Sequence, residues 1–293
     1  MTYSLSGAAV KGPLSFANYR IHEVSFEAAD LKGDIVARGE TTELGKFTEG
    51  GLDLPGNGYY LIEFLASDAT VDLTTGMAPI LPGLSTIVES EALEKSKDIF
   101  ATPLTTIVVD LIRRGNIEDK QGLTDALISQ SLIVKSQLGF ELLDKVDLFH
   151  TPPVAFGNEA DLDDILSYRT ASEATASLVW ALKNETDIST STVLELLVSD
   201  LTDGALDGLA EGLDTNTTQA IQDNYDFLSR LNVGELPVPN TFDPESSDAE
   251  TPLKVGGLVK LLIHETRQYD SSREISAWGI NQNTPLSKLS EPT

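Results

Sequence analysis

Cysteine is absent from the 293 residues of this chain, and histidine occurs only three times. The absence of cysteine excludes disulfides, thiolate catalysis and cysteine-bound zinc. His22, His150 and His264 lie in separate segments, and no two of them have the spacing of a zinc site. Walker, G-x-G-x-x-G, G-x-S-x-G and H-E-x-x-H motifs are also missing. We therefore expect a protein that is not an enzyme of the classes these motifs mark.

Basic residues are scarce, with 20 Lys and Arg against 46 Asp and Glu, a formal net charge of −26. Nucleic acid and anionic membrane surfaces would be repelled, so neither is an expected partner. The excess acid is explained by a solvated surface or by cation binding, and composition alone leaves both explanations open.

Long apolar runs are also missing. No stretch approaches the roughly 18 residues of a membrane span, so we expect no transmembrane segment. The first ten residues, MTYSLSGAAV, have no basic region of the kind that begins a signal peptide. The protein is then either cytoplasmic or has lost an export signal.

The hydrophobic pattern changes at residues 101–114, ATPLTTIVVDLIRR. Before this stretch apolar residues alternate with polar ones, and after it they recur every three or four residues. Within it, Thr102 suits an N-cap and Pro103 suits the first helical position. The pattern predicts a multidomain chain of β structure followed by α structure.

Short strands separated by Gly- and Pro-containing turns are predicted before this point. They cover residues 4–10, 19–26, 35–39, 46–52, 59–65 and 85–88. The spacing predicts that residues 1–97 form an antiparallel β-sandwich of prealbumin-like or Ig-like type.

Five motifs give a resemblance to a known group. They are GAAVKGP at 7–13, TELGKF at 42–47, DLTTG at 72–76, TPLTT at 102–106 and DLTDGALDG at 200–208. Over about residues 5–215 the chain resembles exported bacterial surface lipoproteins with an N-terminal carboxypeptidase-regulatory-like sandwich. The resemblance implies export to the cell surface or periplasm, with a lipid anchor on the full-length precursor. It implies no catalysis.

Residues 98–231 are expected to form a helical bundle, with helices over about 103–114, 120–138, 160–183, 191–201 and 216–230. An acidic segment in this region carries four aspartates beside glycines, Asp200, Asp203, Asp207 and Asp214. We interpret them as speculative Ca²⁺ ligands, or as helix caps and turns, because the order of an EF-hand is missing.

Residues 232–293 are expected to be an extended linker followed by a β-hairpin of strands 257–268 and 273–281. An isolated hairpin is marginally stable, so it should pack on the rest of the chain or join a neighbour's sheet.

Lys11 and Glu63 resemble the lysine and carboxylate that flank intramolecular isopeptide bonds in pilin-type sandwiches. The last predicted strand offers no Asn acceptor, and only Asp68 and Asp72 are near. We interpret Lys11 as a surface lysine and Glu63 as a strand-edge residue, and expect no such bond.

These observations favour a non-catalytic, envelope-associated binding or scaffold module, with a surface glycan or an envelope protein as ligand. The end loops of the sandwich would present Tyr3, Phe16, Asn57 and Tyr59 to it. One alternative is a structural subunit that assembles by β-augmentation through its C-terminal hairpin. Another is a hydrolase with an unrecognised carboxylate pair.

Overall fold

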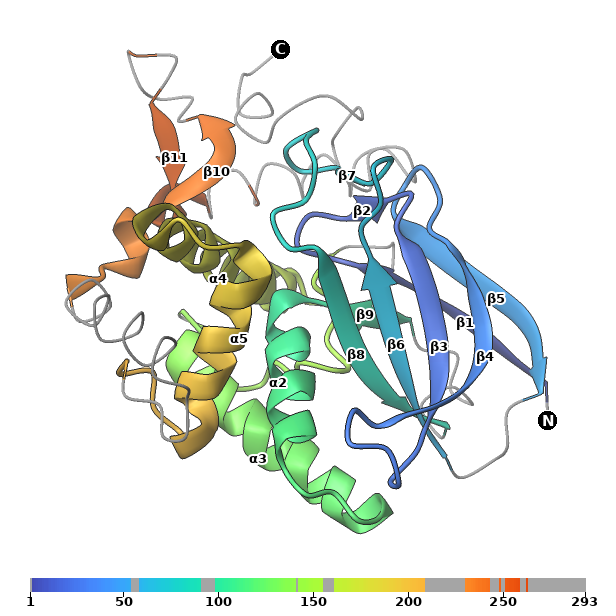
Figure 1. Cartoon of the computed structure of the whole chain (residues 1–293). Coiled ribbons are helices and arrows are strands. Elements are labelled where there is room, and N and C mark those ends of the chain that lie inside the picture. Colours follow the sequence, from blue (N-terminus) through green and yellow to red (C-terminus); the bar gives the residue numbers. More distant parts are fainter. Residues whose placement is uncertain are drawn as a thin grey trace.

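The structure, a computed structural model, describes residues 2–53, 58–90, 98–140, 142–154, 161–208, 230–242, 248, 251–258 and 262. Most strands precede residue 102 and the α-helices follow it (Figure 1). This arrangement confirms the predicted order of β structure followed by α structure.

The larger sheet has four antiparallel strands in the order β4-β3-β6-β8. The strands are β4 (Lys32–Glu40), β3 (Asn18–Val24), β6 (Tyr59–Leu65) and β8 (Gly83–Glu89). Six of the seven residues of β6 are buried. Apolar side chains on both faces make a strand suitable for the interior of a sheet, and β6 is an interior strand, as its sequence predicts.

The smaller sheet has the order β5-β1-β9, with β5 (Lys46–Asp53), β1 (Thr2–Ala9) and β9 (Ile99–Ala101). β1 pairs antiparallel with β5 but parallel with β9. The sequence predicted neither the parallel pair nor β9, which lies just beyond the expected end of the β region. A further short pair joins β2 (Leu14–Ser15) to β7 (Val71–Asp72).

Aromatic side chains connect the two sheets. The ring of Phe47 in β5 lies 5.2 Å from that of Tyr19 and 5.4 Å from that of Phe64, centroid to centroid, and both partners belong to the larger sheet. These buried rings belong to a core that continues without a break into the helices. The sheets and the helices are therefore stabilised by burial of the same apolar surface.

The long α-helices among the described residues are α2 (Pro103–Arg114), α3 (Lys120–Leu138), α4 (Leu162–Thr186) and α5 (Thr190–Asp200). α2 begins as predicted, with Thr102 as N-cap and Pro103 at its first position. Its first turn bonds to the edge of the larger sheet, because Thr106 Oγ1 accepts from the Ser85 N–H and Thr105 Oγ1 donates to the Ser85 carbonyl. α2 therefore lies beside β8, α3 lies below it, and α4 and α5 lie on the side of α2 away from the sheet (Figure 1).

The C-terminal part corrects two expectations. Within the predicted linker, β10 (Pro237–Phe242) pairs with β11 (Pro252–Lys254), after the 3-10 turn η2 (Val233–Glu235). Val238 and Leu253 are buried, so this region packs on the protein. Residues 255–258 are helical, so the strand predicted from Gly257 is wrong at its start. Residue 262, inside the same predicted strand, is helical too, and the other residues of that hairpin and residues 216–229 of the last predicted helix lie outside the described residues.

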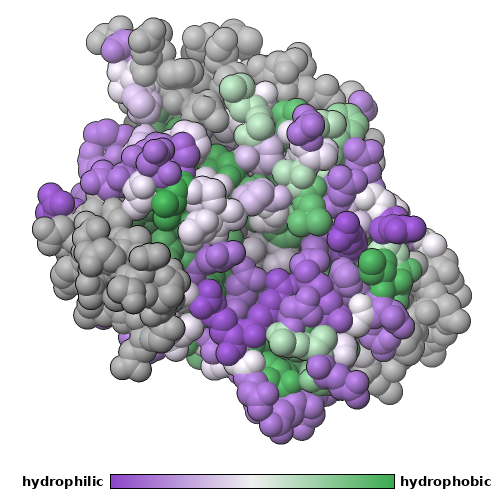
Figure 2. All heavy atoms as spheres, in the orientation of Figure 1, coloured by the Kyte–Doolittle hydropathy of each residue, from purple (hydrophilic) through white to green (hydrophobic). Residues whose placement is uncertain are grey.

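The face seen in Figure 2 is mainly hydrophilic, with small, separate hydrophobic patches. Within the described residues, no helix has both the length and the apolar character needed to cross a membrane.

Candidate functional site

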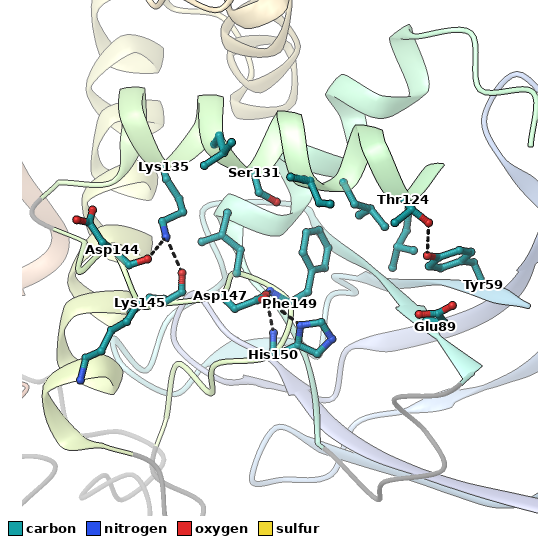
Figure 3. A pocket seen from close by; sticks show the side chains of 16 residues that line it. Tyr59, Glu89, Thr124, Ser131, Lys135, Asp144, Lys145, Asp147, Phe149 and His150 are labelled. Carbon is teal, nitrogen blue, oxygen red and sulfur yellow. Dashed lines mark hydrogen bonds and ion pairs between the residues drawn. The ribbon is translucent and has the colours of Figure 1, made fainter. Parts of the chain in front are cut away.

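A pocket of about 450 Å³ opens between α3, the start of β6, the end of β8 and the segment 144–150 (Figure 3). Apolar and polar side chains both line it. The lining residues are Tyr59, Ile87, Glu89, Thr124, Leu127, Ile128, Ser131, Leu132, Lys135, Asp144, Lys145, Val146, Asp147, Leu148, Phe149 and His150. Mixed lining of this kind is usual where a protein binds a ligand.

The wall formed by α3 carries unusually exposed apolar residues. Asp119 caps the helix by accepting from the Gly122 N–H at 2.8 Å. Ile128 and Leu132, one turn apart on the same face, are 60% and 62% exposed. Two adjacent exposed aliphatic side chains at the mouth of a pocket favour contact with an apolar group of a ligand.

The opposite wall, residues 144–150, is fixed by α3. Lys135 Nζ donates to the backbone carbonyls of Asp144 and Val146, both at 2.7 Å (Figure 3). Asp147 accepts from the backbone N–H groups of Phe149 and His150, and its other oxygen lies 3.0 Å from His150 Nδ1. Burial raises the pKa of Asp147, but His150 and these N–H groups outweigh it and hold the pKa below its ordinary value.

The third wall is built by the sheet. The Tyr59 hydroxyl lies 2.8 Å from Thr124 Oγ1, which ties the start of β6 to α3. Glu89, at the end of β8, pairs with Lys120 at 2.9 Å. The pocket is therefore held by contacts among all of its walls, as a preformed site requires.

The predicted glycan-binding residues are not gathered at one place. Tyr59 lines the pocket, but it is buried at the start of β6 and is not in a loop. Phe16 lies at the other end of β6, where Thr70 Oγ1 donates to its carbonyl, so the two are about 20 Å apart at the usual rise per strand residue. Tyr3 lies in β1, and Asn57 lies outside the described residues.

Two aspartates of the predicted calcium segment, Asp200 and Asp203, accept backbone hydrogen bonds. Asp200 is buried and accepts from the Gly208 N–H at 2.9 Å, and Asp203 accepts from the Ala205 N–H at 3.0 Å. Asp207 lies in the following bend, and Asp214 lies outside the described residues. No group of three or more His, Asp or Glu suited to a metal ion occurs in the part of the chain that the structure describes. Calcium binding stays a prediction.

Lys11 is not a surface residue, contrary to the sequence interpretation. Its Nζ lies 2.9 Å from Asp72 Oδ2 and 3.1 Å from Glu173 Oε2, and all three side chains are at most 1% exposed. Arg169 Nε donates to the other Glu173 oxygen at 3.1 Å, and Arg169 Nη2 donates to Thr74 Oγ1 at 2.5 Å. We call these five residues the Lys11 cluster. Its two cations and two carboxylates balance in charge, as a buried ionic group requires.

Glu63 is not an ordinary strand-edge residue either. It lies in the interior strand β6, where Lys32 Nζ and Arg113 Nη2 contact its Oε1 at 2.9 and 3.0 Å, and His22 Nε2 lies 3.5 Å from its Oε2. We call these four residues the Glu63 cluster. The Lys32 side chain is 33% exposed, so water reaches this cluster.

Comparison with known proteins gives no match: no family model, no curated protein and no solved structure is significantly similar to this chain.

Proposed function

We propose that this chain is a non-catalytic binding module of a bacterial envelope and that the pocket beside α3 holds a segment of a partner protein. The observation that carries the proposal is the exposed pair Ile128 and Leu132 at the mouth of a pocket whose walls are hydrogen-bonded in place. Apolar side chains exposed beside a fixed cavity would lose contact with water when a ligand's apolar side chain enters.

A protein segment fits this pocket better than a glycan. Sugar faces stack on accessible aromatic rings, but Tyr59 is buried and bonded to Thr124, Phe149 is half-buried, and the most exposed apolar side chains of the lining are the aliphatic Ile128 and Leu132. The chain's net charge of −26 favours a partner segment that carries basic residues around its apolar anchor.

The envelope location is supported by the five sequence motifs alone. Three of them meet in space: Lys11 pairs with Asp72, and a Cβ on Gly45 would lie 2.9 Å from Pro13 Cβ. Their joint packing is consistent with one recurring module, which we propose to be a prealbumin-like sandwich followed by a helical bundle. An N-terminal precursor sequence with a lipid-modified Cys would test the location.

Selection from a displayed peptide library, followed by affinity measurement, tests the binding proposal. We expect peptides with an aliphatic residue near Lys or Arg, and at least tenfold weaker binding to Ile128→Asp, because a buried apolar contact is worth about 1.5–3 kcal/mol. Met77→Asp is the matched control, because Met77 is exposed but does not line the pocket. Failure to select any peptide, or equal binding by both variants, would contradict the proposal.

A hydrolase is the second candidate, because the Asp147–His150 pair lines the same pocket and resembles an oriented general base. Turnover of a selected peptide that is lost in His150→Gln while binding persists would favour it.

A further inference from the structure

Lys11, Asp72 and Glu173 come from three distant parts of the chain and meet out of contact with water. Lys11 follows β1, Asp72 ends β7, and Glu173 lies in α4. An amine, a carboxyl group and a second carboxylate held within 3.1 Å of the amine are the groups needed to form an amide between side chains. We propose that Lys11 and Asp72 become joined by an intramolecular isopeptide bond and that Glu173 carries the protons.

Asp72 is held in a suitable position for attack. Its Oδ1 accepts from the Thr74 N–H at 2.9 Å, while its Oδ2 lies toward Lys11 Nζ. That N–H stabilises negative charge on Oδ1 when the amine adds to the carboxyl carbon. Gly12 keeps the two segments together, because a Cβ at that position would lie only 2.0 Å from Asp72 Oδ1.

Glu173 is placed to act as the base. Arg169 donates to its Oε1, which leaves Oε2 facing Lys11. Burial lowers the pKa of Lys11, but Asp72 and Glu173 outweigh it and raise the pKa above its ordinary value. The ion pair is therefore the resting form, and the bond forms slowly through the minority form in which Lys11 has given a proton to Asp72.

The reaction is balanced without any other reagent. Neutral Lys11 Nζ attacks the protonated carboxyl carbon of Asp72, and a C–N bond forms. Glu173 takes a proton from the nitrogen and returns it to the departing hydroxyl, so the C–O bond breaks and one water leaves. Nothing is oxidised or reduced, and the product is a neutral amide beside the remaining Arg169–Glu173 pair.

The test is the intact mass of the purified full chain, measured under denaturing conditions after prolonged incubation in the folded state. We expect a mass one water below that of the sequence, and a branched tryptic peptide linking Lys11 to Asp72. Asp72→Ala should keep its full mass. Asp72→Asn should lose ammonia instead and reach the same final mass as the wild type. Glu173→Gln should slow the reaction at least tenfold, whereas Glu63→Gln should not.

Two results with the wild type and Asp72→Ala, and a third with Asp72→Asn, would overturn the proposal. One is full sequence mass in folded, incubated wild-type protein. The other is a water loss that persists in Asp72→Ala, because Asp203-Gly204 and Asp207-Gly208 can also lose water by forming succinimides. A folded Asp72→Asn that gains the mass change of simple deamidation would likewise exclude the bond.

Discussion

The Lys11 cluster and the Glu63 cluster both join the sheets to the helices, but they differ in their access to water. The first is sealed, whereas the second includes Lys32 at 33% and Arg113 at 19% exposure. A sealed cluster has to balance its own charge, since each missing partner leaves a bare ion in a medium of low dielectric constant. A cluster at the rim is balanced in part by water and salt. The same residue types therefore contribute differently to stability according to depth.

The largest effect is expected from Arg169→Met, which, in protein that has not yet formed the Lys11–Asp72 amide, leaves two carboxylates facing Lys11 alone. Removal of one partner from a buried ionic group costs about 3–5 kcal/mol of unfolding free energy. Urea denaturation measures it, with Arg38→Met on exposed β4 as the control. A loss no greater than that of the control would mean that water reaches the Lys11 cluster.

A smaller effect is expected from Glu63→Gln, which removes a carboxylate bonded to Lys32 and Arg113. Hydrogen bonds to charged groups contribute about 1.5–3 kcal/mol. The difference from the wild type should shrink as salt is added, because this cluster is partly exposed. If the stability difference did not change with salt, the Glu63 cluster would be as inaccessible to water as the Lys11 cluster.

The Glu63 contribution should also depend on pH. Burial raises the pKa of Glu63, but hydrogen bonds from Lys32 and Arg113 outweigh it, so the folded pKa lies below the ordinary value of 4.5. The stabilisation is complete above the unfolded pKa and is lost as pH falls through the folded pKa. Wild type and Glu63→Gln should therefore differ at neutral pH and converge in acid, and divergence in acid would contradict the assignment.

The smallest effect is expected from Lys145→Met. Lys145 pairs with Asp161 and Asp164 at 3.0 and 2.8 Å, but its side chain is 55% exposed. Exposed ion pairs contribute little because water and salt screen them. No measurable change in the melting temperature is expected. A clear decrease in the melting temperature would show that exposure alone does not decide how much each ionic group contributes to stability.

Local sequence patterns predicted the helices and strands whose formation depends on residues close to one another in the sequence. The bounds of α2 and α3 follow from their caps and their apolar periodicity, and β6 follows from its apolar character on both faces. The predicted start of α5, at residue 191, differs from the observed start by one residue, because Ser189 accepts the capping hydrogen bond. Competing cap residues close together in sequence are decided by packing.

The charge clusters and the pocket could not be predicted in the same way. The partners of Lys11 lie 61 residues away in Asp72 and further still in Glu173, so no local pattern marks its burial. β9 is only three residues long and directly precedes the N-cap of α2, so its sequence does not distinguish a strand from the loop that leads into the helix. The sequence suggests Lys11 and Glu63 as members of one site, but in the structure Glu63 pairs with Lys32 and Lys11 pairs with Asp72.

The parallel pairing of β1 with β9 affects the order in which the molecule can be completed during synthesis. β1 is made before β9, so one of its edges stays unpaired until residues 99–101 have been made. Lys11, next to that strand, acquires its second carboxylate only when α4 follows. β1 therefore stays incompletely paired until residue 101 has been made, and the Lys11 cluster stays incomplete until Glu173 has been made. Such a chain reaches its native state late, and a holding chaperone would have a long interval in which to bind it.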